Sequence, residues 1–170
     1  PIAVVNGGKG PAVLFTGGVH GDEYEGQIAV SRLSRRLDPQ SVRGKVILMP
    51  AVDLPAALAG RRMCPIDGRD FNRCLPGDPR GSFCQMLAHF IDTVLLPQVE
   101  ISVDVHAAGN AMEAALSSRL PALDVMIRMT CRKSALRPVL SVSVAWSITC
   151  SRMLKMSGWA FSISSSRTTL

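Results

Sequence analysis

Several features that would assign the chain to a protein class at once are missing from its 170 residues. The five cysteines contain no Cys-x-x-Cys pair, and their odd number argues against a disulfide framework or a structural zinc knuckle, so we expect a reducing cytoplasm. No apolar run reaches the ~20 residues of a membrane-spanning helix, so we expect no membrane partner. The start lacks an initiator methionine and a basic leader, which we interpret as a fragment or a processed product without a signal peptide.

Acidic residues are scarce in the last third of the chain. Residues 117–170 contain eight Lys and Arg but only one acid, Asp124, whereas residues 1–116 contain 11 basic and 12 acidic residues. Apolar residues interrupt the basic ones, unlike the clustered charge of a phosphate-binding stripe, so we expect no nucleic-acid partner. The alternative, a basic interaction protein, predicts salt-dependent retention on DNA that disappears when this segment is deleted.

The remaining composition, 47% hydrophobic and 19% charged, fits a globular domain with a real core. Apolar patterns and turn residues predict strands at 2–5, 12–16, 46–50 and 101–105, and helices at 23–37, 51–60 and 82–95. The Gly- and Pro-containing turn between the first two strands predicts an opening hairpin. The strand, helix, strand order predicts an α/β fold with a mixed, largely parallel sheet flanked by helices.

Metal-ligand side chains follow two of the predicted strands. His20 and Glu23 come after the strand at 12–16, and His106 comes directly after the strand at 101–105. Two imidazoles and a carboxylate, with a fourth position left for water, are typical of a catalytic zinc site, and Asp104 is a candidate to orient it. The alternative is that His20 and Glu23 simply begin a helix, which is the more common reason for this spacing.

A long loop at residues 61–81 is rich in Pro, Gly, Arg and Asp and has no secondary-structure period. Long loops inside compact domains are more often functional than not. Its polar residues suit an anionic substrate, although a solvated loop rich in turn formers is the alternative. These polar residues are Arg62, Asp67, Asn72 and Arg73.

Three motifs together resemble one protein family. They are His20-Gly21-Asp22-Glu23, the run DGRDFNRCLPG at 67–77 and the run DVHAAG at 104–109. In this order and spacing they resemble the succinylglutamate desuccinylase/aspartoacylase family, relatives of the zinc carboxypeptidases. The runs GDEYEGQ and CPIDG look most like the branch that contains N-acetyl-diaminobutyrate deacetylases.

The resemblance implies a zinc-carboxypeptidase-like fold, truncated at its C-terminal side, and a zinc-dependent deacylase. In such an enzyme metal-bound water hydrolyses the amide bond of a small-molecule N-acyl amino acid. Arg62 is implied to polarise the scissile carbonyl, and Asn72 and Arg73 to contact the substrate. The residues implied to bind one zinc ion per chain are His20, Glu23 and His106. Whether the chain forms a homo-oligomer is left open.

The resemblance covers about residues 2–118, which divides the chain into a partial zinc hydrolase-like domain, 1–116, and an atypical basic tail, 117–170. The family's water-activating glutamate is expected downstream, yet the tail contains no glutamate. Loss of a general base typically costs about 10²- to 10⁴-fold in rate. Our hypothesis is a tail that is frame-shifted from residues 117–120 or poorly ordered, with a genuine divergent tail as the alternative. A catalytically inactive metal-binding fragment therefore stays open beside the active enzyme.

Overall fold

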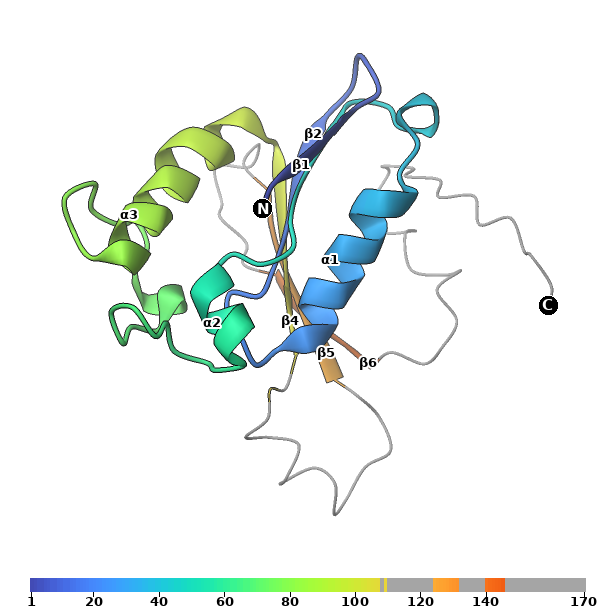
Figure 1. Cartoon of the computed structure of the whole chain (residues 1–170). Coiled ribbons are helices and arrows are strands. Elements are labelled where there is room, and N and C mark those ends of the chain that lie inside the picture. Colours follow the sequence, from blue (N-terminus) through green and yellow to red (C-terminus); the bar gives the residue numbers. More distant parts are fainter. Residues whose placement is uncertain (108, 110–123, 132–139, 146–170) are drawn as a thin grey trace.

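The computed structural model describes residues 1–107, 109, 124–131 and 140–145 (Figure 1). Its strands are β1 (Ala3–Asn6), β2 (Ala12–Gly17), β3 (Lys45–Met49), β4 (Ile101–His106), β5 (Asp124–Cys131) and β6 (Leu140–Ala145). Its α-helices are α1 (Tyr24–Arg36), α2 (Leu54–Ala59) and α3 (Phe83–Phe90). Short 3₁₀ or π turns are η1 (Pro39–Ser41), η2 (Phe71–Arg73), η3 (Ile91–Leu95) and η4 (Leu96–Gln98).

The strands form one six-stranded sheet in the order β1-β3-β2-β4-β5-β6. β2 pairs in parallel with both β3 and β4, whereas β1, β5 and β6 pair antiparallel with their neighbours. The mixed sheet flanked by helices that the sequence predicts is therefore confirmed, with its parallel pairings confined to β3, β2 and β4. Parallel strands end on the same side of a sheet, which gathers whatever follows β2 and β4 at one edge.

The predicted opening hairpin is wrong, because β3 lies between β1 and β2. Val46 of β3 pairs with Val5 on one side and with Val13 on the other. All residues of β3 after Lys45 are buried, so this strand needs a hydrogen-bonded neighbour along each edge. β1 is half exposed, which suits an edge position and leaves the centre to β3 and β2.

Helices cover both faces of the sheet, with α1 on one side and α3 on the other (Figure 1). Side chains alternate between the two faces along each strand. Leu14 of β2 packs in a cluster with Ala88 of α3, whereas its neighbour Val13 packs in a second cluster with Val30 of α1. The two clusters fix the orientation of β2 and therefore of the chain that leaves its end.

The predicted helices are confirmed, with one change. The helix expected at 82–95 is α-helical only to Phe90 and continues as the π turn η3 and the 3₁₀ turn η4, which contains Pro97. Proline lacks the N–H that would continue a helix, so the chain turns toward β4 here. None of the helices among the described residues is long and apolar enough to cross a membrane.

The C-terminal segment 117–170 is described only at β5 and β6. Both continue the sheet beside β4 through antiparallel pairings, beginning at Ile101 paired with Cys131. The remaining residues of the predicted basic tail, including the proposed frame change at 117–120, lie outside the described residues.

Candidate metal centre

The turn after β2 is held in place by the chain that follows β3. The N–H of Val52 donates to the carbonyl oxygen of Gly17 (2.9 Å), and the N–H of Asp53 donates to that of Gly18 (3.0 Å). A Cβ atom on Gly21 would lie 2.0 Å from the carbonyl carbon of Ala56, so only glycine permits this approach. These contacts hold the turn against α2, so that the intervening residue, His20, stays at the carboxyl end of β2.

Glu23 lies immediately before α1, and His106 is the last residue of β4. Because β2 and β4 are parallel neighbours, His20 and His106 emerge at the same end of the sheet. The exposed fractions of His20, Glu23 and His106 are only 2%, 4% and 6%. The predicted ligand residues from three separate elements are therefore brought together in a buried cluster.

The carboxylate of Glu23 bridges the two imidazoles. Its Oε1 lies 2.6 Å from Nδ1 of His20, and its Oε2 lies 2.9 Å from Nδ1 of His106. The N–H of Ala107 also donates to Oε2 (3.0 Å). The ring centroids are 5.3 Å apart, and the ligand atoms of the three residues all lie within 4.8 Å of one another. A single ion could therefore contact one nitrogen from each ring and the carboxylate.

A second carboxylate lies against the far nitrogen of each imidazole. Asp70 Oδ1 is 3.1 Å from Nε2 of His20, and Asp104 Oδ2 is 2.6 Å from Nε2 of His106. The hydroxyl of Thr16 donates to the other oxygen of Asp104 (2.8 Å), which fixes that carboxylate. Asp104 and His106 are two residues apart on β4 and therefore share one face, so the contact expected from the sequence is present.

These outer carboxylates allow a test of whether the cluster fits a cation. When the single N–H of a neutral imidazole lies on Nε2, where it faces Asp70 or Asp104, the lone pair of Nδ1 faces the carboxylate of Glu23. Two acceptors repel at such distances unless a proton or a metal ion lies between them. Nitrogen and oxygen donors of this kind, with a carboxylate behind each imidazole, are typical of zinc ligands, so the residues fit this ion.

The pKa values show how strongly the cluster favours positive charge beside Glu23. Burial alone raises the pKa of Glu23, but hydrogen bonds from His106, His20 and Ala107 lower it to about 2. Burial lowers the pKa of His106, but its hydrogen bonds to Asp104 and Glu23 raise it to about 9. The carboxylate is therefore held ionised, as a metal ligand must be.

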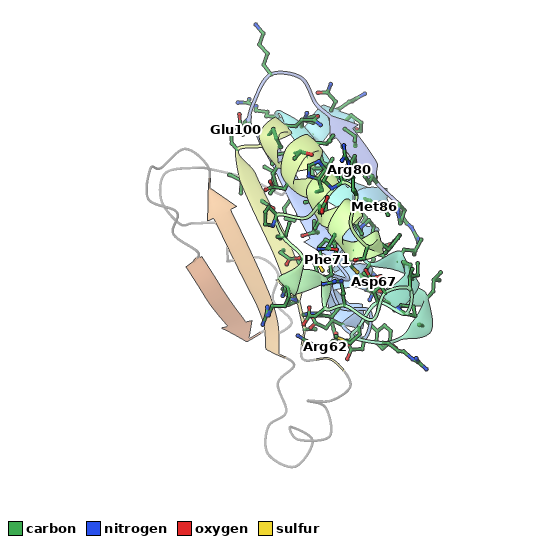
Figure 2. All side chains as sticks on the ribbon, turned by 90° about the vertical axis from the view of Figure 1, so that its left-hand side faces the viewer. Arg62, Asp67, Phe71, Arg80, Met86 and Glu100 are labelled. Atoms are coloured by element: carbon green, nitrogen blue, oxygen red, sulfur yellow. The ribbon has the colours of Figure 1, made fainter. Side chains whose placement is uncertain are left out.

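Arg62, predicted to act on the substrate carbonyl, also lies at this cluster. Its Nη1 is 3.6 Å from Oε1 of Glu23 and its Nη2 is 3.4 Å from Oδ2 of Asp70, while half of the side chain stays exposed. Figure 2 shows it at the end of the molecule opposite Glu100, which immediately precedes β4. Arg62 therefore places part of its guanidinium against the cluster and part toward solvent.

Sequence reasoning missed Asp70. Burial raises its pKa, but the N–H of Asn72, then His20 and Arg62, lower the net value. The resembling motif contained Asp70, but its contact with His20 crosses 50 residues of sequence and no periodic pattern reports it. Asn72 and Arg73 lie in η2, which begins directly after Asp70. Among the described residues, neither of their side chains hydrogen-bonds to the three ligand residues.

The fold and the cluster define a class: an α/β protein with a candidate metal centre of the catalytic type at the carboxyl ends of parallel strands. The chain belongs to the succinylglutamate desuccinylase/aspartoacylase family, because the model of that family's catalytic domain matches residues 9–144. The match continues past residue 118, where the sequence resemblance was expected to stop.

Individual relatives agree with this family. The chain is 45% identical over 113 residues to an N-alpha-acetyl-L-2,4-diaminobutyric acid deacetylase of Halomonas elongata, covering 66% of this chain and 33% of the relative. A crystal structure of a succinylglutamate desuccinylase/aspartoacylase from Rhodobacter sphaeroides is 65% identical with a TM-score of 0.63, covering 64% of this chain and 33% of that one.

A product-bound ectoine utilization protein from Ruegeria pomeroyi is 40% identical with a TM-score of 0.60, covering 61% of this chain and 32% of that one. The chain thus spans about a third of the length of these relatives.

Proposed function

We propose that the protein is a zinc-dependent hydrolase that removes the acyl group from a small N-acyl amino acid. One zinc ion would be held by His20, Glu23 and His106. The deacetylase and desuccinylase names of the relatives support amide hydrolysis of this kind. The similarity to the Halomonas elongata enzyme makes N-acetylated diaminobutyrate the first substrate to test.

The bridge that Glu23 makes between the two imidazoles carries this proposal. The ligand atoms of the three residues lie within 4.8 Å of one another, and Asp70 and Asp104 lie against the opposite ring nitrogens. This arrangement presents Nδ1 of both rings on the side of Glu23, where the ion would be held. When bound, zinc lowers the pKa of a coordinated water to about 7 and polarises a carbonyl oxygen.

The loop at 61–81 would supply the substrate contacts. Arg62 has five N–H donors, and only some of them face Glu23 and Asp70, so others can donate to the oxygen of the scissile carbonyl. Charge that develops on this oxygen during attack would be stabilised by the guanidinium. Asn72 and Arg73 are proposed to bind the substrate carboxylate or acyl group.

The proposal is tested by measuring zinc content and hydrolysis of N-acetyl-diaminobutyrate with the purified 170-residue chain, before and after chelation. We expect about one zinc ion per chain at this cluster, turnover that chelation abolishes, and recovery when zinc returns. His106→Ala should lose the zinc ion of this cluster together with turnover. His89→Ala is the matched control, because His89 lies on α3 outside the cluster and should keep both. A chain that neither binds zinc nor responds to chelation would exclude the proposal.

A catalytically inactive metal-binding protein is the second candidate. It is favoured by the absence of glutamate from residues 117–170, since the family's water-activating glutamate has no counterpart there. The same experiment separates the two candidates. One zinc ion fewer per chain in His106→Ala than in wild type, with no turnover of any N-acyl amino acid by wild type, would establish the inactive form.

We also propose a reducing cytoplasm as the location. Cys64, Cys74 and Cys84 are buried free thiols, and none of them forms a disulfide among the described residues. Thiols persist in this form where glutathione and thioredoxin keep them reduced. Cell fractionation with an antibody against the chain would test the location, and recovery in a periplasmic or extracellular fraction would contradict it.

A further inference from the structure

A second cluster of ligand-type side chains lies where the loop 61–81 meets α2 and α3. It contains Asp53 at the start of α2, Cys64 in the loop and Cys84 in the first turn of α3. One ligand atom from each residue lies within 4.8 Å of the others. Their exposed fractions are 0%, 1% and 0%, so this is a closed site inside the protein.

The sulfur of Cys84 faces more hydrogen-bond acceptors than its single hydrogen can satisfy. Two carboxylate oxygens face the sulfur of Cys84, namely Oδ1 of Asp67 at 3.2 Å and Oδ2 of Asp53 at 3.8 Å. A thiol has a single hydrogen and donates weakly, so it can satisfy only one of the two. Oδ1 of Asp53 accepts from the N–H of Ala56 (3.0 Å), which leaves the fully buried Oδ2 with the long contact to sulfur alone. A buried carboxylate with so few hydrogen-bond donors is unfavourable unless a cation or a proton neutralises its charge.

The spacing of these atoms matches the coordination sphere of a small thiophilic ion. Zinc–sulfur and zinc–oxygen bonds of about 2.3 and 2.0–2.2 Å put neighbouring ligands of a tetrahedron about 3.3–3.8 Å apart. The distances from Cys84 Sγ to the two carboxylates, 3.2 and 3.8 Å, lie close to this range. Thiolates select zinc or cadmium over magnesium or calcium.

We propose that Asp53, Cys64 and Cys84 bind a second divalent thiophilic cation such as Zn²⁺. Binding deprotonates both thiols, releases two protons to solvent and forms two metal–sulfur bonds. Because all three ligand side chains are fully buried, the site is closed to substrate and has a structural role, unlike the cluster of His20, Glu23 and His106. The ion fastens the loop to both α2 and α3.

Cobalt(II) is the probe that distinguishes this thiol cluster (Asp53, Cys64 and Cys84) from the histidine cluster (His20, Glu23 and His106). Thiolate ligands give cobalt an intense near-ultraviolet charge-transfer band, and the proposed ligands His20, Glu23 and His106 contain no sulfur. The experiment is a cobalt titration of the 170-residue chain carrying Cys131→Ser and Cys150→Ser, so that only the three buried thiols remain. Refolding in the presence of the metal gives the ion access to the closed site.

We expect the band to appear in this background and to persist in His106→Ala, with one cobalt ion bound per chain in that variant. Cys64→Ser with Cys84→Ser should abolish it. Cys74→Ser is the control for a buried thiol that contacts Cys84 without being one of the three proposed ligands, so the band should remain in this variant.

The absence of a charge-transfer band in the reduced background protein would overturn the proposal, and this observation needs no substitution at the proposed ligands. A band that survives the double substitution at Cys64 and Cys84, or that the Cys74 substitution abolishes, would also overturn it. As a second measurement, zinc should raise the Tm of His106→Ala, and this rise should disappear when Cys64 and Cys84 are replaced. An unchanged Tm in His106→Ala would contradict a structural ion.

Discussion

Replacement of Asp104 by asparagine should weaken zinc binding without removing a ligand. In the native arrangement Oδ2 of Asp104 accepts a hydrogen bond from Nε2 of His106 at 2.6 Å, while Oδ1 accepts from the hydroxyl of Thr16. Asparagine keeps the size and the bond to Thr16 but presents an NH₂ group to Nε2. His106 must then carry its hydrogen on Nδ1, the atom that the metal needs.

The loss can be estimated from two contributions that act in the same direction. The native carboxylate holds the correct tautomer and makes the ring more basic, and loss of such outer partners typically costs about 10- to 100-fold in metal affinity. This range corresponds to about 1.4–2.7 kcal/mol. We expect the upper half of the range, because the contact is short and His106 is 6% exposed, so little water can replace the lost acceptor.

Competition with a chromogenic zinc chelator measures the Kd for wild type and Asp104→Asn, with thermal unfolding of the metal-free proteins alongside. Asp92→Asn is the control, because it removes the same charge from η3, away from the cluster. A Kd for Asp104→Asn within about threefold of wild type would refute the reasoning. Equal loss of affinity in Asp92→Asn would show that net charge, rather than the contact to His106, is responsible.

Three further changes test the rest of the structure. Asp70→Asn removes the other outer carboxylate at a longer distance, 3.1 Å, so zinc affinity in the same chelator assay should fall about tenfold, and an unchanged Kd would contradict its contact with the ring. Gly26→Ala puts a Cβ atom 2.4 Å from the carbonyl oxygen of Val105, so urea denaturation should show a loss of about 1–3 kcal/mol. Leu14→Ala removes a fully buried side chain and should cost about 2–5 kcal/mol, whereas Leu58→Ala, at 82% exposure, should change stability by no more than about 0.5 kcal/mol.

The order and type of the helices and central strands could be predicted because each has a local pattern. The apolar period of residues 23–37 corresponds to α1, and the continuous apolar run at 46–50 corresponds to the buried strand β3. The pairing of β1 could not be predicted in the same way. A turn rich in glycine and proline favours a hairpin locally, but the need of β3 for a partner on each edge is decided by the whole sheet.

The histidine cluster could be predicted because its ligands end neighbouring parallel strands. The position of His20 and His106 follows from the register of β2 and β4, which brings both to the same edge. The loop 61–81 was harder to predict, because contacts such as that of Asp70 with His20 depend on how a long segment without a periodic pattern packs against the rest of the domain. The thiol cluster was missed for a related reason: Cys64 and Cys84 are widely spaced in the sequence, and no pair motif connects them.

Residues of the loop 61–81 contact both the thiol cluster and the histidine cluster. The N–H of Cys64 donates to the carbonyl of Arg69 (3.0 Å), and the N–H of Gly68 donates to the carbonyl of Cys64 (2.8 Å), which closes residues 64–69 into one hydrogen-bonded turn. Asp67 within this turn receives the N–H of Cys84 from α3, and Asp70 directly after it reaches His20. A change that releases the turn from α3 therefore also frees the carboxylate behind His20. Substitutions at the thiol cluster should consequently weaken metal binding at the histidine cluster, although none of them touches its ligands.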